Sequence, residues 1–236
     1  MAHTQDVICD PKTGLCMLPP LDETSQQEVD WNEDTEIIYV GDPMCSWCWG
    51  ISPALHQLEH SAAEKGIPFR IVVGGLRPGG GDPWNEQFKN FLKHHWDEVN
   101  ARSGQPFGNA LFERESFNYD TEPSCRAVVS VRKLAPALEH RFFELVQHYF
   151  YVQNEDPGTV DFYRPICEKL DIDFAEFSTC FESEEMRKAT LADFEMNRQW
   201  GVRGYPTVLL RQGNQLTPIA RGFASYEQMW EQVKGS

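Results

Sequence analysis

Long apolar runs are missing from this sequence of 236 residues, and so are the marks of a secretory leader. No stretch reaches the roughly 20 consecutive apolar residues that a membrane-spanning helix needs. Residues 1–21 have neither the basic start nor the apolar core that a signal peptide shows. We therefore expect a cytoplasmic protein that does not insert into a membrane.

Positive charge is also scarce, with 21 Lys and Arg against 36 Asp and Glu and a net charge of −15. Nucleic acids and anionic membranes attract basic surfaces, so this charge argues against both as partners. The seven cysteines are an odd number in a chain that is not short, so a disulfide-stapled secreted scaffold is not expected. The length allows one large domain or two small ones, with a sizeable core.

The chain does contain a closely spaced pair of cysteines, in the segment Cys45-Ser46-Trp47-Cys48. The apolar run 37–40 before it predicts a strand, and the apolar period after it predicts a helix. The pair therefore lies at the start of a helix, where the helix dipole and free N–H groups favour the reactive thiolate form. Such a C-x-x-C next to a βαβ pattern is typical of thioredoxin-like redox sites, although the same residues could be half of a zinc site.

Hydrophobic periodicity predicts strands at 36–41 and 69–73 on either side of a helix at 46–65, which together form a parallel βαβ unit. A strand at 205–211 and a strand at 215–221, joined at Gly213-Asn214, predict a hairpin. A Ser-x-x-Gln capping box then opens a last helix that runs to about residue 234. Between these parts the pattern is almost wholly helical, with helices expected at 84–103, 122–134, 136–152, 160–170, 174–181 and 184–200.

This order of elements, and four sequence motifs within it, resemble the FrnE-type branch of the DsbA family. The motifs are Asp42-Pro43-Met44-Cys45-Ser46-Trp47-Cys48-Trp49-Gly50, Gly74-Gly75-Leu76-Arg77-Pro78-Gly79, Asp120-Thr121-Glu122-Pro123-Ser124-Cys125-Arg126-Ala127-Val128 and Gly201-Val202-Arg203-Gly204-Tyr205-Pro206-Thr207. The resemblance covers residues 36–234 and implies an α/β, thioredoxin-like fold with an inserted all-helical domain. It divides the chain into a tail at 1–35, a thioredoxin-like domain at 36–82 and 184–236, and the insert at 83–183.

The resemblance also assigns roles to individual residues. It implies that Cys45 is the nucleophile and that Cys48 is the more buried thiol that resolves the mixed disulfide. It implies a cis bond at Pro206, which would place the backbone of Tyr205 beside Cys45, ready to pair with a substrate strand. Trp47 and Tyr205 could add an aromatic lip for substrates.

A second cysteine pair, Cys9 and Cys16, lies in the tail and outside the resemblance. The segment between them contains Asp-Pro-x-x-Gly, which is turn chemistry, so the chain reverses and the two thiols could meet. One interpretation is a second redox pair that exchanges with Cys45 and Cys48. The others are a static disulfide and two free thiols.

The function that we predict is thiol–disulfide exchange, with the oxidase, reductase or isomerase direction left open. The partners expected are proteins or peptides with thiols or disulfides, and glutathione as a redox partner, with no metal and no cofactor beyond the redox-active disulfide. One alternative is a glutathione-dependent isomerase or transferase of the kappa or 2-hydroxychromene-2-carboxylate isomerase type, although these carry serine in place of Cys45. Another is a zinc module built from Cys9, Cys16, Cys45 and Cys48, whose first pair has unusual spacing for zinc.

Two further groups have less defined expectations. Asp42, three residues before Cys45, is either a nearby proton acceptor or a residue that caps the helix or starts a turn with Pro43. The cysteines of the helical region are expected to be inert core thiols, because cysteine is among the most buried residue types. They are Cys125, Cys167 and Cys180.

Overall fold

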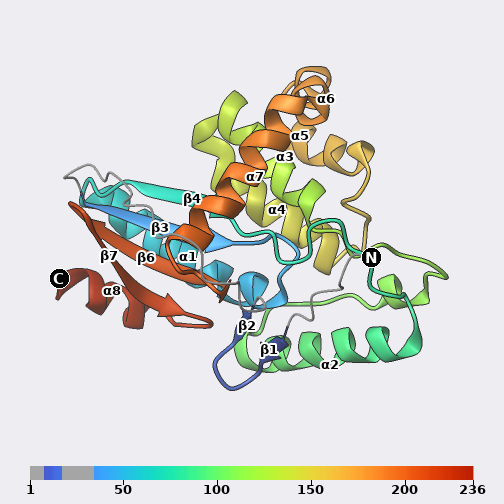
Figure 1. Ribbon diagram of the computed structural model, residues 1–236, viewed down its shortest axis with the longest axis horizontal. Coiled ribbons are helices and arrows are strands. Elements are labelled where there is room, and N and C mark those ends of the chain that lie inside the picture. The colour runs from blue at the N-terminus through green and yellow to red at the C-terminus, as the bar shows by residue number, and fades with distance from the viewer. Residues whose placement is uncertain (1–7, 18–34, 236) are drawn as a thin grey trace.

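A four-stranded sheet forms the centre of the computed structural model, which describes residues 8–17 and 35–235. The expected tail at 1–35 thus lies partly outside the described residues. The strand order is β4-β3-β6-β7, in which β3 is parallel to β4 and antiparallel to β6 (Figure 1). The bounds are β3 Glu36–Gly41, β4 Phe69–Val73, β6 Thr207–Gln212 and β7 Gln215–Arg221.

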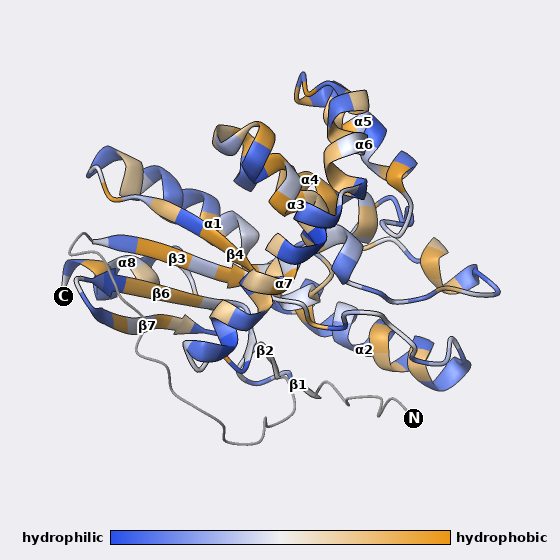
Figure 2. Ribbon diagram, turned by 45° about the horizontal axis from the view of Figure 1, so that its top comes forward, coloured by the Kyte–Doolittle hydropathy of each residue, from blue (hydrophilic) through white to orange (hydrophobic). Residues whose placement is uncertain are grey.

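The middle strand β3 is buried along its whole length, because its apolar run Ile37 to Val40 is covered on both faces. Helix α1 (Ser46–Glu64) follows directly, and α8 (Tyr226–Lys234) contacts it. Figure 1 shows α7 (Glu184–Gln199) crossing in front of the sheet and α1 behind it. Figure 2 shows hydrophobic stretches along β3 and β6, as expected for inner strands of a sheet covered by helices. The fold is α/β, as the sequence predicts.

Helices fill the chain between β4 and α7, in the positions that the apolar periodicity predicts. They are α2 Glu86–Ser103, α3 Glu122–Leu134, α4 Glu139–Tyr151, α5 Arg164–Lys169 and α6 Phe174–Glu182, with short 3₁₀ turns η1 Ala110–Glu113, η2 Pro136–Leu138 and η3 Val160–Tyr163. The domain boundaries at residues 83 and 184 stay a prediction.

Three helix predictions are wrong in detail. The helix expected from residue 84 begins at Glu86, because the Asn85 side chain caps it by accepting the N–H of Phe88. The expected helices at 136–152 and 160–170 each begin with a 3₁₀ turn, η2 and η3. A proline lies in the first turn of both η2 and α5, where it favours a new helical start over continuation of the segment before it.

An ion-pair network joins α3 and α7 to the edge of the sheet. The Arg132 guanidinium donates to both carboxylate oxygens of Asp193, at 3.2 and 2.9 Å, and to the carbonyl of Ile71 at 3.0 Å. The Asp193 carboxylate also accepts the N–H of Val73 at 3.0 Å. This network, which we call the α3–α7 junction, satisfies main-chain groups of β4 with charged side chains, of which Asp193 is buried and Arg132 is 28% exposed.

A small second sheet lies beside the end of the first one, with the order β1-β2-β5. Its strands are β1 Ile8–Asp10, β2 Leu15–Met17 and β5 Gly204–Tyr205. The strand expected at 205–211 is therefore wrong at its start. Pro206 separates β5, in the small sheet, from β6, in the large one, because proline has no N–H to continue a ladder.

Candidate active site

The cysteines of the C-x-x-C segment lie where β3 ends and α1 begins, as the sequence predicts. Cys45 is the N-cap residue of α1; its N–H donates to the Asp42 carbonyl at 3.0 Å, and its carbonyl accepts the N–H of Trp49 at 3.1 Å. Cys48 lies in the first turn, and both cysteines are 0% exposed. The positive end of the α1 dipole thus faces Cys45.

The two thiols are close enough to affect each other. Burial raises the pKa of the Cys48 thiol well above its usual value, and the neighbouring Cys45 raises it further. The nearby Tyr39 side chain lowers the pKa of Cys48 but does not offset burial. Cys48 is therefore a protonated thiol at neutral pH, as expected for a residue that acts second.

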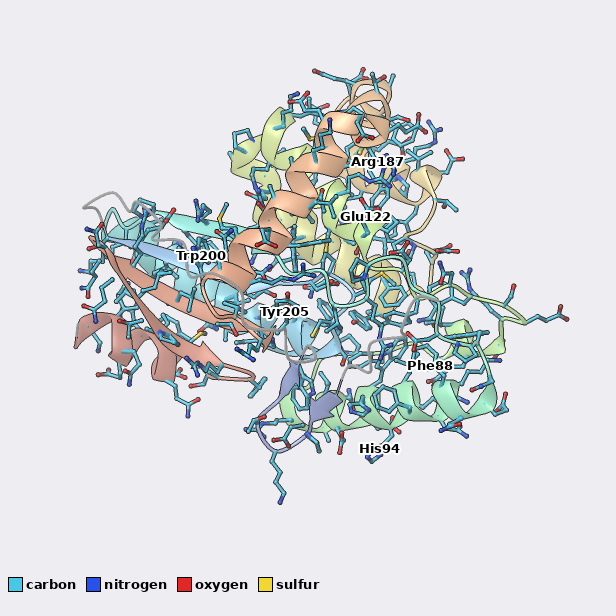
Figure 3. The ribbon with its side chains drawn as sticks, in the orientation of Figure 1. Phe88, His94, Glu122, Arg187, Trp200 and Tyr205 are labelled. Carbon is cyan, nitrogen blue, oxygen red and sulfur yellow. The ribbon has the colours of Figure 1, made fainter. Side chains whose placement is uncertain are left out.

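The Tyr205–Pro206 bond is cis, which confirms the expectation from the resemblance. The Tyr205 carbonyl oxygen lies 3.7 Å from Cys45 Sγ. The side chain of Tyr205, labelled in Figure 3, instead donates its hydroxyl to the carbonyl of Gly74. A Cβ on Gly74 would lie 2.5 Å from the Tyr205 ring, so only glycine fits there. The structure thus brings the Tyr205 backbone, and not its side chain, to the nucleophile.

Asp42 is fully buried below the cysteines. Its carboxylate accepts the N–H of Leu76 at 2.7 Å and that of Met44 at 2.8 Å, and lies 3.5 Å from the Sγ of Cys125. Burial raises its pKa, and these hydrogen bonds, with one from Thr121, offset only part of that increase. The bond to Met44 confirms the turn role expected for Asp42, while its role as a proton acceptor stays a prediction.

The sequence did not identify two residues near Asp42 and Cys45 as functional candidates. Cys125 is buried as expected, but it contacts Asp42 directly, and burial raises its own pKa well above the usual value. Tyr119 donates its hydroxyl to the Met44 carbonyl at 2.8 Å, which holds the loop before Cys45. The only sequence signal for Cys125 was the motif at 120–128, which does not reveal what it contacts.

Trp47 and Tyr205 do not form an exposed lip in this structure, because both are 0% exposed. The Trp47 ring packs edge-on against Phe223 at a centroid distance of 6.1 Å, and the Gly14 backbone lies over it. The backbone of Cys16 lies opposite Tyr205 in the small sheet. The side chains of Cys9 and Cys16 lie outside the described part of the structure.

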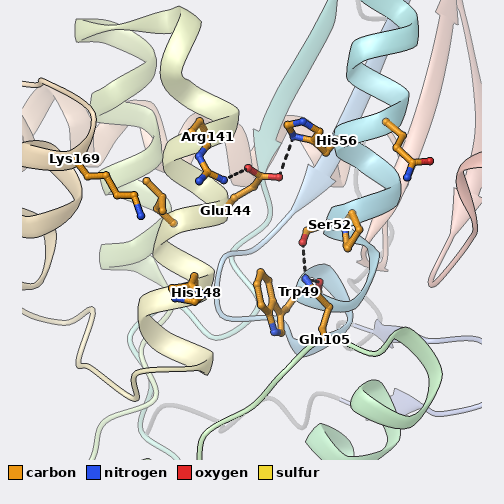
Figure 4. A pocket seen from close by; sticks show the side chains of 11 residues that line it. Trp49, Ser52, His56, Gln105, Arg141, Glu144, His148 and Lys169 are labelled. Atoms are coloured by element: carbon orange, nitrogen blue, oxygen red, sulfur yellow. Dashed lines mark hydrogen bonds and ion pairs between the residues drawn. The ribbon is translucent and has the colours of Figure 1, made fainter.

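A pocket between α1 and α4 includes neither Cys45 nor Cys48 (Figure 4). Its volume is about 400 Å³, and its walls come mainly from α1 and α4. Glu144 lies between His56, at 3.3 Å, and Arg141, at 2.8 Å. Glu144 thus has partners from both helices, and neither thiol lines the pocket.

No cluster of three or more His, Cys, Asp or Glu side chains that could hold a metal occurs within residues 8–17 and 35–235, as far as their side chains are described. The zinc alternative, which needs the side chains of Cys9 and Cys16, thus lies outside this finding. None of the described helices is long and apolar enough to cross a membrane.

Solved structures with the same fold include two bacterial proteins that are described as acting on disulfides. A protein from Nitrosomonas europaea with a proposed protein disulfide isomerase activity is 32% identical, with a TM-score of 0.79 over 86% of this chain and 97% of its own. The cytosolic disulfide reductase DsbM from Pseudomonas aeruginosa is 23% identical, with a TM-score of 0.69 over 85% of this chain and 97% of its own. DsbM has also been solved with GSH.

Among curated proteins, the ClpXP adapter protein SpxH from Shouchella clausii is 22% identical over 87% of this chain. The match spans 66% of that protein and 57% of SpxH from Bacillus subtilis, so the chain covers less than two thirds of these relatives.

The family model of the DSBA-like thioredoxin domain matches residues 36–234, the range over which the sequence motifs resemble the DsbA family. The fold is thus thioredoxin-like, as the resemblance implied, and it is shared by thiol–disulfide oxidoreductases and related isomerases. The chain belongs to the family of DSBA-like thioredoxin domains.

Proposed function

We propose that this protein is a thiol–disulfide oxidoreductase in which Cys45 is the nucleophile and Cys48 the resolving thiol. The observation that carries the proposal is the placement of two neighbouring thiols at the start of α1, with the main-chain carbonyl of Tyr205 beside the first of them. The helix end and the burial of Cys48 give the two sulfurs different chemistry.

The exchange takes place in two displacement steps. The Cys45 thiolate attacks one sulfur of a substrate disulfide, which forms a mixed disulfide and releases the other substrate sulfur as a thiolate. Cys48 then loses its proton and attacks Cys45 Sγ, which releases the second substrate thiolate and leaves a Cys45–Cys48 disulfide. The substrate gains two electrons and the enzyme loses two. The reverse sequence oxidises a dithiol substrate.

The raised pKa of Cys48 fits the order of these steps. Part of the increase comes from Cys45, whose negative charge opposes a second one nearby. Once Cys45 is bound in a mixed disulfide it carries no charge, so this contribution is lost and Cys48 ionises more easily. The resolving thiol is thus held back until the nucleophile has reacted.

The substrates that we propose are proteins or peptides with thiols or disulfides, and glutathione is the small redox partner. The cysteine at both positions 45 and 48 favours dithiol chemistry over the glutathione-dependent isomerase or transferase alternative. DsbM, which shares the fold, is described as cytosolic and has been solved with GSH, and this supports glutathione as a partner and the cytoplasm as the location.

A comparison of Cys45→Ser, Cys48→Ser and a control, Cys180→Ser on α6, tests the proposal. In a disulfide reduction assay with glutathione, Cys45→Ser should fall to the uncatalysed rate, because Cys48, the thiol that remains at this helix start, is protonated. Cys48→Ser should accumulate a mixed disulfide at Cys45, visible by mass spectrometry. Cys180→Ser should keep full activity. Full turnover by Cys45→Ser, or isomerase activity that survives it, would contradict the assignment.

The reduction potential of the Cys45–Cys48 pair decides the direction. A value near about −270 mV, as in thioredoxin, indicates a reductase, and one near about −120 mV, as in DsbA, indicates an oxidant. Equilibration with glutathione buffers followed by mass spectrometry measures it directly. Stoichiometric zinc in the reduced protein would instead support the metal-binding alternative.

A further inference from the structure

The hairpin at residues 8–17 lies along the backbone segment next to the nucleophile. β2 pairs antiparallel with β5, and its register places Cys16 opposite Tyr205. The Tyr205 carbonyl lies 3.7 Å from Cys45 Sγ, so a strand paired with Tyr205 runs beside Cys45. Extended peptides commonly bind by pairing with a free strand edge. In this structure a segment of the same chain holds that edge (Figure 1).

The turn of the hairpin fits closely against the active-site helix and the loop after β7. The Thr13 carbonyl accepts the N–H of Phe223 at 3.1 Å. Gly14 has a φ of +69°, and a Cβ there would lie 2.7 Å from Phe223 Cβ and 2.9 Å from Trp47 Cε3. A Cβ on Gly222 would lie 2.3 Å from the Thr13 oxygen. Both glycines thus allow the two backbones to approach each other directly over Trp47.

Two more groups fix the shape of this turn. The Asp10 carboxylate accepts the N–H of Lys12 at 2.9 Å and the hydroxyl of Thr13 at 3.1 Å. From α2, the Arg102 guanidinium donates to the Lys12 carbonyl at 2.9 Å. The segment 10–14 is thus a built turn with its own cap and a cation from another element, not an extended tail.

The backbone of the hairpin also brings its two cysteines together. The register places Cys9 directly opposite Cys16. Opposite residues in an antiparallel pair have Cα atoms about 4.5–5.5 Å apart, within the range of about 4.4–6.8 Å that a disulfide needs. Cys9, Cys16 and Tyr205 therefore occupy one row across three neighbouring strands, and the row ends at the carbonyl beside Cys45.

We infer that Cys9 and Cys16 form a second redox site, whose disulfide is an internal substrate of Cys45. This inference rests on the proposed function, to which it adds an internal substrate within the same chain. The Cys45 thiolate attacks the Cys16 sulfur of a Cys9–Cys16 disulfide, which forms a Cys16–Cys45 disulfide and releases Cys9 as a thiolate. Cys48 loses its proton and attacks Cys45, which releases Cys16. Two electrons pass to the hairpin, which ends as a dithiol, and the Cys45–Cys48 disulfide forms.

We call this transfer of electrons between the hairpin pair and the Cys45–Cys48 pair the relay. The order of the strands gives it an outer and an inner end. β1 is the open edge of the small sheet among the described strands, so Cys9 is on the outer strand and Cys16 on the strand next to Tyr205. Cys45 itself is 0% exposed. External thiols, with glutathione as the class proposed above, thus exchange with the hairpin pair at Cys9, and Cys16 passes the electrons inward or outward.

Trapping the intermediate tests the relay in the full-length chain. The double variant Cys9→Ser with Cys48→Ser keeps Cys16 and Cys45 as the pair that should react. On exposure to oxidised glutathione it should form a Cys16–Cys45 disulfide, identified by peptide mapping under non-reducing conditions. The matched variant Cys16→Ser with Cys48→Ser keeps Cys9, one strand farther away, and should form the Cys9–Cys45 link at least about tenfold more slowly.

Displacing the hairpin should slow the reaction without touching any cysteine. Adding Gly14→Ala to the first double variant should reduce the rate of Cys16–Cys45 formation at least about tenfold, which corresponds to about 1.4 kcal/mol of lost docking. Gly213→Ala is the control, because Gly213 also has a positive φ, of +57°, but a Cβ there would meet no atom within 4 Å. It should leave the rate unchanged.

The two proposals fail in different ways. The variant Cys9→Ser with Cys16→Ser retains only the Cys45–Cys48 pair at the site. If this pair still exchanges with glutathione while no Cys16–Cys45 disulfide forms in the trapping variant, the relay is wrong and the proposed function stands. If Cys45 exchanges with nothing in any variant, the proposed function is wrong as well. Equal rates for the Cys9 and Cys16 trapping variants would also overturn the relay.

Discussion

The α3–α7 junction, which bonds to β4, and the hairpin at residues 8–17, which lies against the start of α1, are held in different ways. The junction is made by side chains. Arg132 and Asp193 form a bidentate ion pair, and Asp193 also accepts a main-chain N–H of β4. The hairpin is held mostly by main chain, through the ladder to β5 and the contacts of Thr13 and Gly14. One attachment is charged and largely buried, and the other is built from short backbone contacts.

The difference has a mechanical consequence. Removing one partner of a buried ion pair leaves an unpaired charge, so such a pair tends to break only when the fold does. A two-stranded ribbon is only marginally stable alone. We therefore expect the junction to last as long as the folded state and the hairpin to open locally. Such local opening would expose Cys45, which has no exposed surface while the hairpin is docked.

Asp193→Ala should give the largest effect, a loss of about 2–4 kcal/mol of unfolding free energy, because it removes both hydrogen bonds from Arg132 and leaves the buried N–H of Val73 without its acceptor. Glu139 still pairs with Arg132 at 2.7 Å, so the guanidinium is not left without a partner. The surrounding carboxylates raise the pKa of Arg132, so it stays charged at every working pH. Chemical denaturation followed by fluorescence measures the change.

Glu185→Ala is the matched control for that prediction. The Lys133–Glu185 pair also joins α3 to α7, at 2.6 Å, but both side chains are substantially exposed. Exposed pairs contribute about 0–1 kcal/mol. A loss in Glu185→Ala equal to that in Asp193→Ala would mean that burial does not distinguish the two contacts.

Asp42 should give a pH-dependent effect of intermediate size. Burial raises its folded-state pKa, so between its unfolded pKa of about 3.9 and the raised value the folded state binds more protons than the unfolded state. Stability should therefore fall as the pH rises through this window, with a slope of at most about 1.4 kcal/mol per pH unit. Below the window the contribution is fully retained.

Comparing unfolding free energies of the wild type and Asp42→Asn at a series of pH values isolates this slope from that of other carboxyl groups. Asparagine keeps an oxygen for the N–H of Leu76 or Met44 but cannot ionise. The difference between the two proteins should change with pH in the window and be constant outside it. A constant difference throughout would show that Asp42 ionises normally.

The local parts of this site could be predicted from the sequence. The strand at 36–41, the helix that follows it and the position of Cys45 at the helix start all depend on the apolar pattern and the spacing of neighbouring residues. The reversal of the chain between Cys9 and Cys16 also follows from turn residues between them, and the register of β1 and β2 confirms it. Each of these depends on a few consecutive residues, so no knowledge of the packing is needed.

The parts that could not be predicted depend on contacts between distant segments. Nothing in residues 8–17 shows that β2 pairs with β5, or that Gly14 packs on Trp47, because the pairing is set by the edge that Tyr205 offers. The contact between Asp42 and Cys125 also joins separate elements. The strand expected at 205–211 was wrong for a related reason, since Pro206 divides it between two sheets.

Arg102→Gln should give the smallest effect, and it tests the hairpin alone. The variant loses the hydrogen bond to the Lys12 carbonyl and the position of the guanidinium over the Phe223 ring, at 5.2 Å. An exposed cation–π contact contributes about 0.5–1 kcal/mol, so the hairpin should open about two to five times more often. Alkylation of Cys45 in the reduced, folded protein should accelerate by the same factor, because Cys45 has no exposed surface while the hairpin is docked.

Arg164→Gln is the control for this measurement, since Arg164 lies over the Phe174 ring at 3.9 Å in a distant helix pair. It removes the same kind of contact and should leave Cys45 alkylation unchanged. If both variants accelerate it equally, Cys45 becomes accessible by loosening of the whole fold. If only Arg102→Gln does, while its global unfolding free energy stays near that of the wild type, the hairpin opens as a unit and the contrast with the α3–α7 junction holds.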